Sequence, residues 1–207
     1  MPKVGAEANA IGIRHGRERV AEMDHLTPGM FTAWQNFYVI VGSSAGALTG
    51  LQFVVITLVA QARAVGSMRD IHAFGTPTVI HFCTALLLSA AMTAPWHSVE
   101  MLGGCLLAGG FTGVGYSFRV LSHARKAAYK PSVEDWVWYV TVPFIAHLVL
   151  LGAAVLVYLA IGWSLVAVAA DVLVFLLLGV HNAWDTVTFV AVQHSPQSSS
   201  SDANAVT

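Results

Sequence analysis

The sequence predicts an all-α fold, a polytopic transmembrane bundle of about five spanning helices. Charged residues make up 10% of the 207 residues and hydrophobic residues 56%, whereas a soluble domain carries about 25% charged residues. The apolar runs match the roughly 20 helical residues that cross a bilayer core. The 6 tryptophans all fall near the ends of these runs, as expected for side chains that favour the membrane interfaces.

The first span, residues 35–60, contains no Lys, Arg, Asp or Glu, and glycine recurs within it at every fourth position. Residues four apart share one helix face, so Gly42, Gly46 and Gly50 predict a groove without side chains, a glycine zipper. In lipid such a groove lets another backbone approach closely. The neighbour is another helix of this chain, a second subunit or a pore, and the pattern leaves these alternatives open.

Further spans are predicted at residues 76–96, 99–120, 136–160 and 164–192. In the third span, Gly109 and Gly113 repeat the four-residue spacing and predict a second face for close packing. In the fourth span, Pro143 deprives the carbonyl of Tyr139 of its hydrogen-bond donor, so we expect a kink there.

The two ends of the chain are polar: residues 1–33 are expected to form a polar or interfacial segment, and the Ser-rich residues 193–207 a disordered tail. With five crossings, the connectors after the first and third spans share the side of the C-terminus. Basic loops favour the cytoplasm, so the C-terminus is predicted inside and the N-terminus outside. The basic residues on that side are Arg63, Arg69, Arg119, Arg125, Lys126 and Lys130.

Polar side chains inside the spans are the functional candidates, because lipid cannot solvate them. On the last span, Asp171, Asn182 and Asp185 fall near one stripe that should face the bundle interior or a water-filled path. Helix depth alone brings a larger set to the cytoplasmic half, with His147 nearer the midplane. That set is Gln52, His81, Tyr116, Arg119, His181, Asn182 and Asp185.

Three interpretations of the buried histidines stay open. They are neutral imidazoles bonded to one another or to backbone carbonyls, parts of a proton or ion path, or ligands of a metal or haem. No cofactor is predicted, because no His-Glu-x-x-His or clustered cysteine pattern is present. The weak metal candidates are His81, His147, His181 and Asp185.

The run FYVIVGSSAGALTGLQFVVITLVA, preceded by Trp34, resembles the first helix of a widespread group of small bacterial integral membrane proteins. Those proteins open with an aromatic anchor, a Gly/Ala/Ser-rich segment and a Gly-Leu-x-Phe-Val run, and some are labelled modulators of a membrane-bound protease. The resemblance covers mainly residues 34–60 and implies a bacterial inner-membrane protein; the group supplies no established catalytic residues, so no site carries over to this chain. Gln52 stands where a second Leu or Phe is usual in that group.

Together these features predict a non-enzymatic, homo-oligomeric membrane protein that serves as a subunit, scaffold or modulator of a larger membrane assembly. No nucleophile elbow, phosphate loop or nucleotide fingerprint points to an enzyme. The alternatives are an ion channel or proton-linked transporter that uses the polar stripe, and a metal- or haem-binding protein that uses the histidines. The bilayer is the expected partner, and a formal net charge of -1 predicts no nucleic acid.

Overall fold

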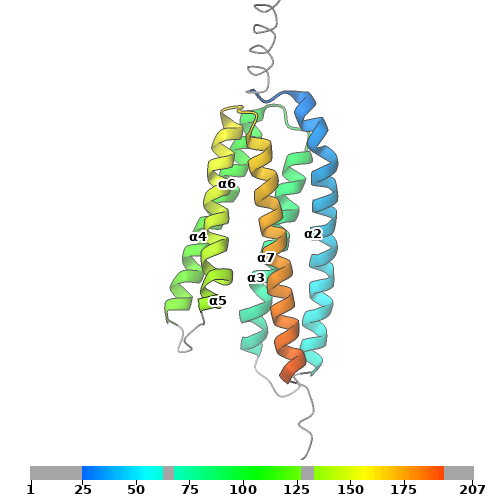
Figure 1. Ribbon diagram of the computed structural model, residues 1–207, viewed down its shortest axis with the longest axis vertical. Helices are drawn as coiled ribbons and strands as arrows, with labels where there is room; N and C mark the ends of the chain where they lie inside the picture. The colour runs from blue at the N-terminus through cyan, green and yellow to red at the C-terminus, as the bar shows by residue number, and fades with distance from the viewer. Residues whose placement is uncertain (1–24, 63–67, 127–132, 194–207) are drawn as a thin grey trace, which may run out of the picture.

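The computed structural model describes residues 25–62, 68–126 and 133–193 (Figure 1). Within these ranges the chain is helical apart from turns, which confirms the all-α class. In this part of the chain 5 helices are long and apolar enough to cross a membrane, as the sequence predicted. Most of the predicted N-terminal segment, up to residue 24, and residues 194–207 of the predicted tail lie outside the described residues.

The helices run up and down the bundle in sequence order. They are α2 (Pro28–Ala62), α3 (Met68–Thr93), α4 (Val99–Lys126), α5 (Val133–Trp136), the π-helix η1 (Val137–Thr141), α6 (Val142–Tyr158) and α7 (Ser164–Gln193). Because α2, α4 and α7 run in one direction and α3 and α6 in the other, the described chain begins and ends at opposite ends of the bundle (Figure 1). α7 packs against α2, α3 and α6, whereas α4 packs mainly against α6.

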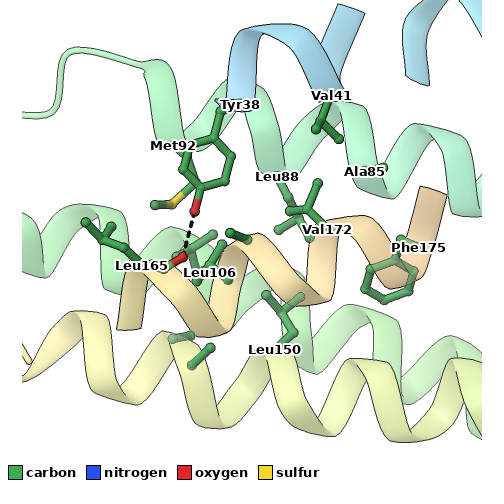
Figure 2. Packing of buried hydrophobic residues seen from close by; sticks show 14 of the residues in the cluster. Tyr38, Val41, Ala85, Leu88, Met92, Leu106, Leu150, Leu165, Val172 and Phe175 are labelled. Carbon is green, nitrogen blue, oxygen red and sulfur yellow. Dashed lines mark hydrogen bonds between the residues drawn. The ribbon is translucent and has the colours of Figure 1, made fainter. Parts of the chain in front are cut away.

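The buried core follows α7, and Figure 2 shows the side chains of the other crossings that pack there. Leu88 comes from α3, Leu106 from α4 and Leu150 from α6. From α2, the hydroxyl of Tyr38 donates a hydrogen bond to the carbonyl of Leu165 at 3.0 Å (Figure 2). In lipid, packing and hydrogen bonds rather than the hydrophobic effect hold helices together, so these contacts fix α7 at the centre.

Two of the glycines on the predicted packing faces allow very close approaches between helices. A Cβ on Gly42 of α2 would lie 2.8 Å from the Cβ of Ser89 on α3. A Cβ on Gly113 of α4 would overlap the imidazole of His147 on α6. Both glycines are therefore required for packing between helices of this same chain.

The other glycines of the predicted faces are less crowded. A Cβ on Gly46 would make an ordinary contact of 3.8 Å with Leu86, and a Cβ on Gly50 or Gly109 would meet no atom within 4 Å. On the glycine face of α2, Gly42 therefore packs against α3 of the same chain, whereas a Cβ on Gly50 would meet no described atom within 4 Å.

Three helices extend beyond their predicted bounds, and the first of them, α2, begins at Pro28 instead of near residue 35. α3 begins at Met68 instead of near residue 76, and it contains Pro77 within its length. A proline removes only one hydrogen-bond donor from a helix, and the helical turns before and after Pro77 are both present. α4 continues to Lys126 instead of ending near residue 120. The stretches of these helices that are long and apolar enough to cross a membrane include Thr76–Thr93 and Val99–Ser122.

The fourth crossing is irregular directly before Pro143. α5 passes into η1 and then into α6, so one predicted helix is three consecutive pieces. Proline has no N–H with which to reach the carbonyl of Tyr139. The chain widens instead, and the N–H of Val142 donates to the carbonyl of Val137, five residues earlier. Such π-turns are frequent at functional segments.

The turn from α6 to α7 contains Ala160 in the left-handed conformation, with a φ of 56°. The turn also includes Gly162 and Trp163, and no glycine of the described chain has a positive φ. The N–H of Ile161 donates to the carbonyl of Leu156 at 2.9 Å, the bond typical of a Schellman helix end. The carbonyl of Ala160 accepts from the N–H of Leu26 at 2.8 Å, so the turn also holds the chain before α2.

Candidate functional site

Two histidines buried in the membrane spans are held in the same way. His81 of α3 and His147 of α6 each follow a proline by four residues, and each Nδ1 bonds to the carbonyl of that proline. The distances are 2.8 Å to Pro77 and 2.7 Å to Pro143. A carbonyl oxygen can only accept, so both Nδ1 atoms carry the proton. Each Nε2 is thereby left as the proton acceptor of a neutral imidazole.

Both imidazoles contact one aromatic side chain of α7. The ring centroid of Phe175 lies 4.8 Å from that of His147 and 6.2 Å from that of His81, edge-on in both cases. Phe175 is fully buried (Figure 2). On the far side of His147, the Oγ of Ser117 on α4 lies 3.3 Å from Nδ1. The structure thus brings together two histidines that helix depth alone had separated.

Polar side chains continue along the buried face of α7 on either side of Phe175. Ser164, Asp171 and Asn182 are 0%, 2% and 0% exposed. From Ser164 to Asn182 the helix rises about 27 Å, close to the roughly 30 Å of a hydrocarbon core. The inward face of α7 therefore carries polar groups across most of the membrane.

Several buried polar atoms of α7 and of its neighbours α2 and α3 have no hydrogen-bond partner within the described part of the chain. They are Gln52 Nε2, His81 Nε2, Ser89 Oγ, Ser164 Oγ, Asp171 Oδ2, Asn182 Nδ2 and Asn182 Oδ1. All of them belong to α2, α3 or α7, and the described parts of α4 and α6 contribute none. An unpaired buried polar group costs roughly 1–3 kcal/mol, so apolar side chains would stabilise these three helices better.

The remaining predicted candidates lie away from this centre. His181 stacks on Trp138 with ring centroids 3.9 Å apart. Asp185 is exposed and accepts a hydrogen bond of 2.9 Å from the hydroxyl of Tyr139. Of the last two candidates, Tyr116 is half-buried and Arg119 is exposed. The predicted convergence is therefore limited to the histidine pair and the inward side of α7.

Sequence reasoning missed Phe175, Ser89 and Ser164. Phe175 follows Asp171 by four residues, so the predicted stripe contained the signal for it. The two serines carried no such signal, because a serine in a membrane helix usually bonds to its own backbone. Ser44 and Ser122 do so here, each donating to the carbonyl four residues earlier.

Within the histidine pair, only the two Nε2 atoms could hold a metal or haem, since each Nδ1 bonds a proline carbonyl. Among the described residues, no three His, Cys, Asp or Glu side chains are grouped as metal ligands would be. No protein-family model, curated protein or solved structure matches the chain.

Proposed function

We propose that this chain is a multi-pass membrane protein that conducts protons through its own bundle, along the inward face of α7. The observation that carries the proposal is the set of unpartnered buried polar atoms on α2, α3 and α7. A proton path needs groups that exchange protons at intervals across the membrane, connected by water. Asp171 and the two histidines supply the exchanging groups, while Ser164 and Asn182 supply hydrogen-bonding groups near the two ends.

The histidine pair is the centre of this path. Because each Nδ1 is bound to a proline carbonyl, His81 and His147 take up and release a proton at Nε2. Phe175 contacts both rings, so the path from one histidine to the other runs past this side chain. Asp171, one helical turn from Phe175 on the same face, exchanges the proton with the other half of the membrane.

The energetic cost of the unpartnered groups supports a role beyond packing. Each unpartnered group costs roughly 1–3 kcal/mol. A few of them together therefore equal much of the free energy of unfolding of a whole protein, which is about 5–15 kcal/mol. A purely structural helix would carry Val or Leu at every inward position, as α7 does at Val168, Val172 and Leu178. Polar groups retained at such a cost are expected to exchange with water and protons.

The test is proton flux into liposomes that contain the purified protein and a pH-sensitive dye, driven by a potassium diffusion potential. Asp171→Asn keeps the shape of the side chain and removes its exchangeable proton. We expect the flux to fall at least about tenfold, which corresponds to about 1.4 kcal/mol of added barrier. Glu100→Gln is the matched control, because it makes the same change at an exposed acid in the first turn of α4.

The control variant should conduct as the wild type does. Equal flux from wild type, Asp171→Asn and Glu100→Gln would overturn the proposal. So would a wild-type flux no greater than that of empty liposomes.

We further propose that the protein lies in the bacterial inner membrane, with the N-terminus outside and the C-terminus in the cytoplasm. The basic residues next to the connectors support this orientation, since basic loops remain on the cytoplasmic side. The start of α3, which contains Arg69, and the end of α4, which contains Arg125, lie at the same end of the bundle (Figure 1).

The oligomeric scaffold or modulator of a membrane assembly is the second candidate. It is favoured by the open positions at Gly50 and Gly109, where a Cβ would meet no atom within 4 Å. A helix of a second copy or of another protein can approach closely at such positions. Gly42 and Gly113 give this candidate no support, because their contacts lie within the chain.

A further inference from the structure

A pocket of about 240 Å³ lies between α2, α3 and α7. Its inner wall contains Gln52 and Phe82, which are 2% and 1% exposed. Its rim contains Leu51 and Trp184, which are 57% and 70% exposed. All four residues lie within the apolar spans of their helices, so the pocket opens sideways toward lipid.

The aromatic wall of the pocket is held in a fixed position. The ring of Phe82 packs directly on Gly179 of α7, where a Cβ would overlap it. This close approach leaves the ring no room to turn toward α7, so the wall is formed before any ligand arrives.

Gln52 supplies the hydrogen-bonding chemistry of the inner wall. Its Nε2 is buried without a partner, and the described side chains that line the pocket are apolar apart from Gln52 and the indole of Trp184. A carboxamide donates from its nitrogen and accepts at its oxygen, so it pairs with either a carbonyl or a hydroxyl. No charged side chain of the described chain lines the pocket, and an ionised ligand would therefore be buried without a counter-charge.

The size of the pocket limits how much of a ligand it holds. Sites for drug-sized molecules measure about 300–1,000 Å³, so a pocket of about 240 Å³ accommodates one substituted ring and leaves a long tail in the lipid. The rings of Phe82 and Trp184 offer apolar faces against which a flat ring can pack.

We propose that this pocket binds the head of an uncharged, lipid-soluble ring compound of the quinone type, with Gln52 as its hydrogen-bonding residue. The amide of Gln52 donates to the carbonyl of the oxidised ring and accepts from the hydroxyl of the reduced ring. The ligand enters from the bilayer past Leu51 and Trp184, and its tail remains among the lipid chains. This proposal is independent of proton conduction and requires no redox step in the protein.

The test is equilibrium binding of decylubiquinone to the purified protein in lipid nanodiscs, followed by quenching of tryptophan emission. The difference between wild type and Trp184→Phe isolates the signal from the pocket rim. We expect saturable quenching, an affinity about tenfold lower in Gln52→Leu, and no saturable binding in Ala183→Phe, which fills the pocket. Leu87→Phe adds the same ring on an exposed part of α3 that does not line the pocket, and it should bind as wild type does.

Thermal unfolding of each variant establishes that it is folded, and Gln52→Leu removes an unpaired polar group, so it should fold well. Non-saturable quenching that is equal in all variants would show partitioning into lipid only and overturn the proposal. Competition by decane as effective as that of decylubiquinone would also overturn it, because the pocket would then recognise only the chain. If ligand binding follows the expected pattern but proton flux is absent, the proton path is contradicted and the ligand site is not.

Discussion

The α4–α6 pair and the α2–α3–α7 group are packed in different ways. Along the α4–α6 seam, three glycines lie against the partner helix so closely that a Cβ at any of them would clash. The pairs are Gly103 with Tyr158, Gly110 with Leu151 and Gly113 with His147. The α2–α3–α7 group also has two such close glycines, Gly42 and Gly179, but it contains every unpartnered buried polar side-chain atom of the described chain, together with the pocket. The first region is built for contact, and the second departs from good packing in the way that functional sites do.

His147 belongs to both regions and shows how they are connected. Its ring is enclosed on one side by Gly113 and Ser117 of α4 and contacts Phe175 of α7 on another. Its Nδ1 is fixed by the carbonyl of Pro143. The seam therefore serves as the support that holds one histidine in register with the polar face of α7.

The largest expected effect breaks the seam. Gly113→Ala places a methyl group on the imidazole of His147, and we expect a loss of about 1–3 kcal/mol in the free energy of unfolding. Gly109→Ala, one turn away on α4, meets no atom within 4 Å and should gain up to about 1 kcal/mol from better helix propensity. Thermal and denaturant unfolding in detergent measure both.

A similar stability for these two alanine variants would contradict the assignment of Gly113 to the seam. Native mass spectrometry of the same pair also sharpens the second candidate function. A lower subunit number in Gly109→Ala alone would indicate that the open face of α4 contacts another copy.

In the α2–α3–α7 group, a substitution is expected to raise the free energy of unfolding instead of lowering it. Asn182→Leu replaces an amide with two unpartnered atoms by an apolar side chain of similar branching, and it should raise the free energy of unfolding by about 1–2 kcal/mol. The same variant should lower proton flux, so stability and function move in opposite directions. Unfolding in detergent and the liposome assay are the two measurements.

Thr186→Val is the control for Asn182→Leu, one turn further along α7. The hydroxyl of Thr186 is already satisfied by the carbonyl of Asn182 at 2.8 Å, so its loss should cost about 0.5–1 kcal/mol. A destabilised Asn182→Leu variant would mean that the amide is paired in the folded protein, and the contrast between the two regions would fail.

The sequence predicted the crossings but only part of the site. Five spans follow from apolar length, and the polar stripe of α7 follows from periodicity, so Asp171 and Asn182 could be found in advance. The meeting of His81 and His147 at Phe175 depends on how α3, α6 and α7 rotate against one another, which no single-helix pattern contains. In the same way, glycine spacing indicated close packing without identifying the partner helix.

The smallest expected effect lies at the turn where the chain passes from the seam to α7. Ala160 has a φ of 56°, which costs an L-residue about 1–2 kcal/mol. Ala160→Gly removes that strain but frees the unfolded chain by about 0.4–1 kcal/mol, so the net gain should be about 0.5 kcal/mol. Differential scanning calorimetry should detect a small rise in Tm, with proton flux unchanged.

Ala169→Gly, the same substitution inside the buried part of α7, should lose about 1 kcal/mol or more in the free energy of unfolding. Opposite signs for the two glycine variants would show that the strain is specific to the turn, whereas a loss at both would mean that Ala160 contributes packing that outweighs its backbone strain.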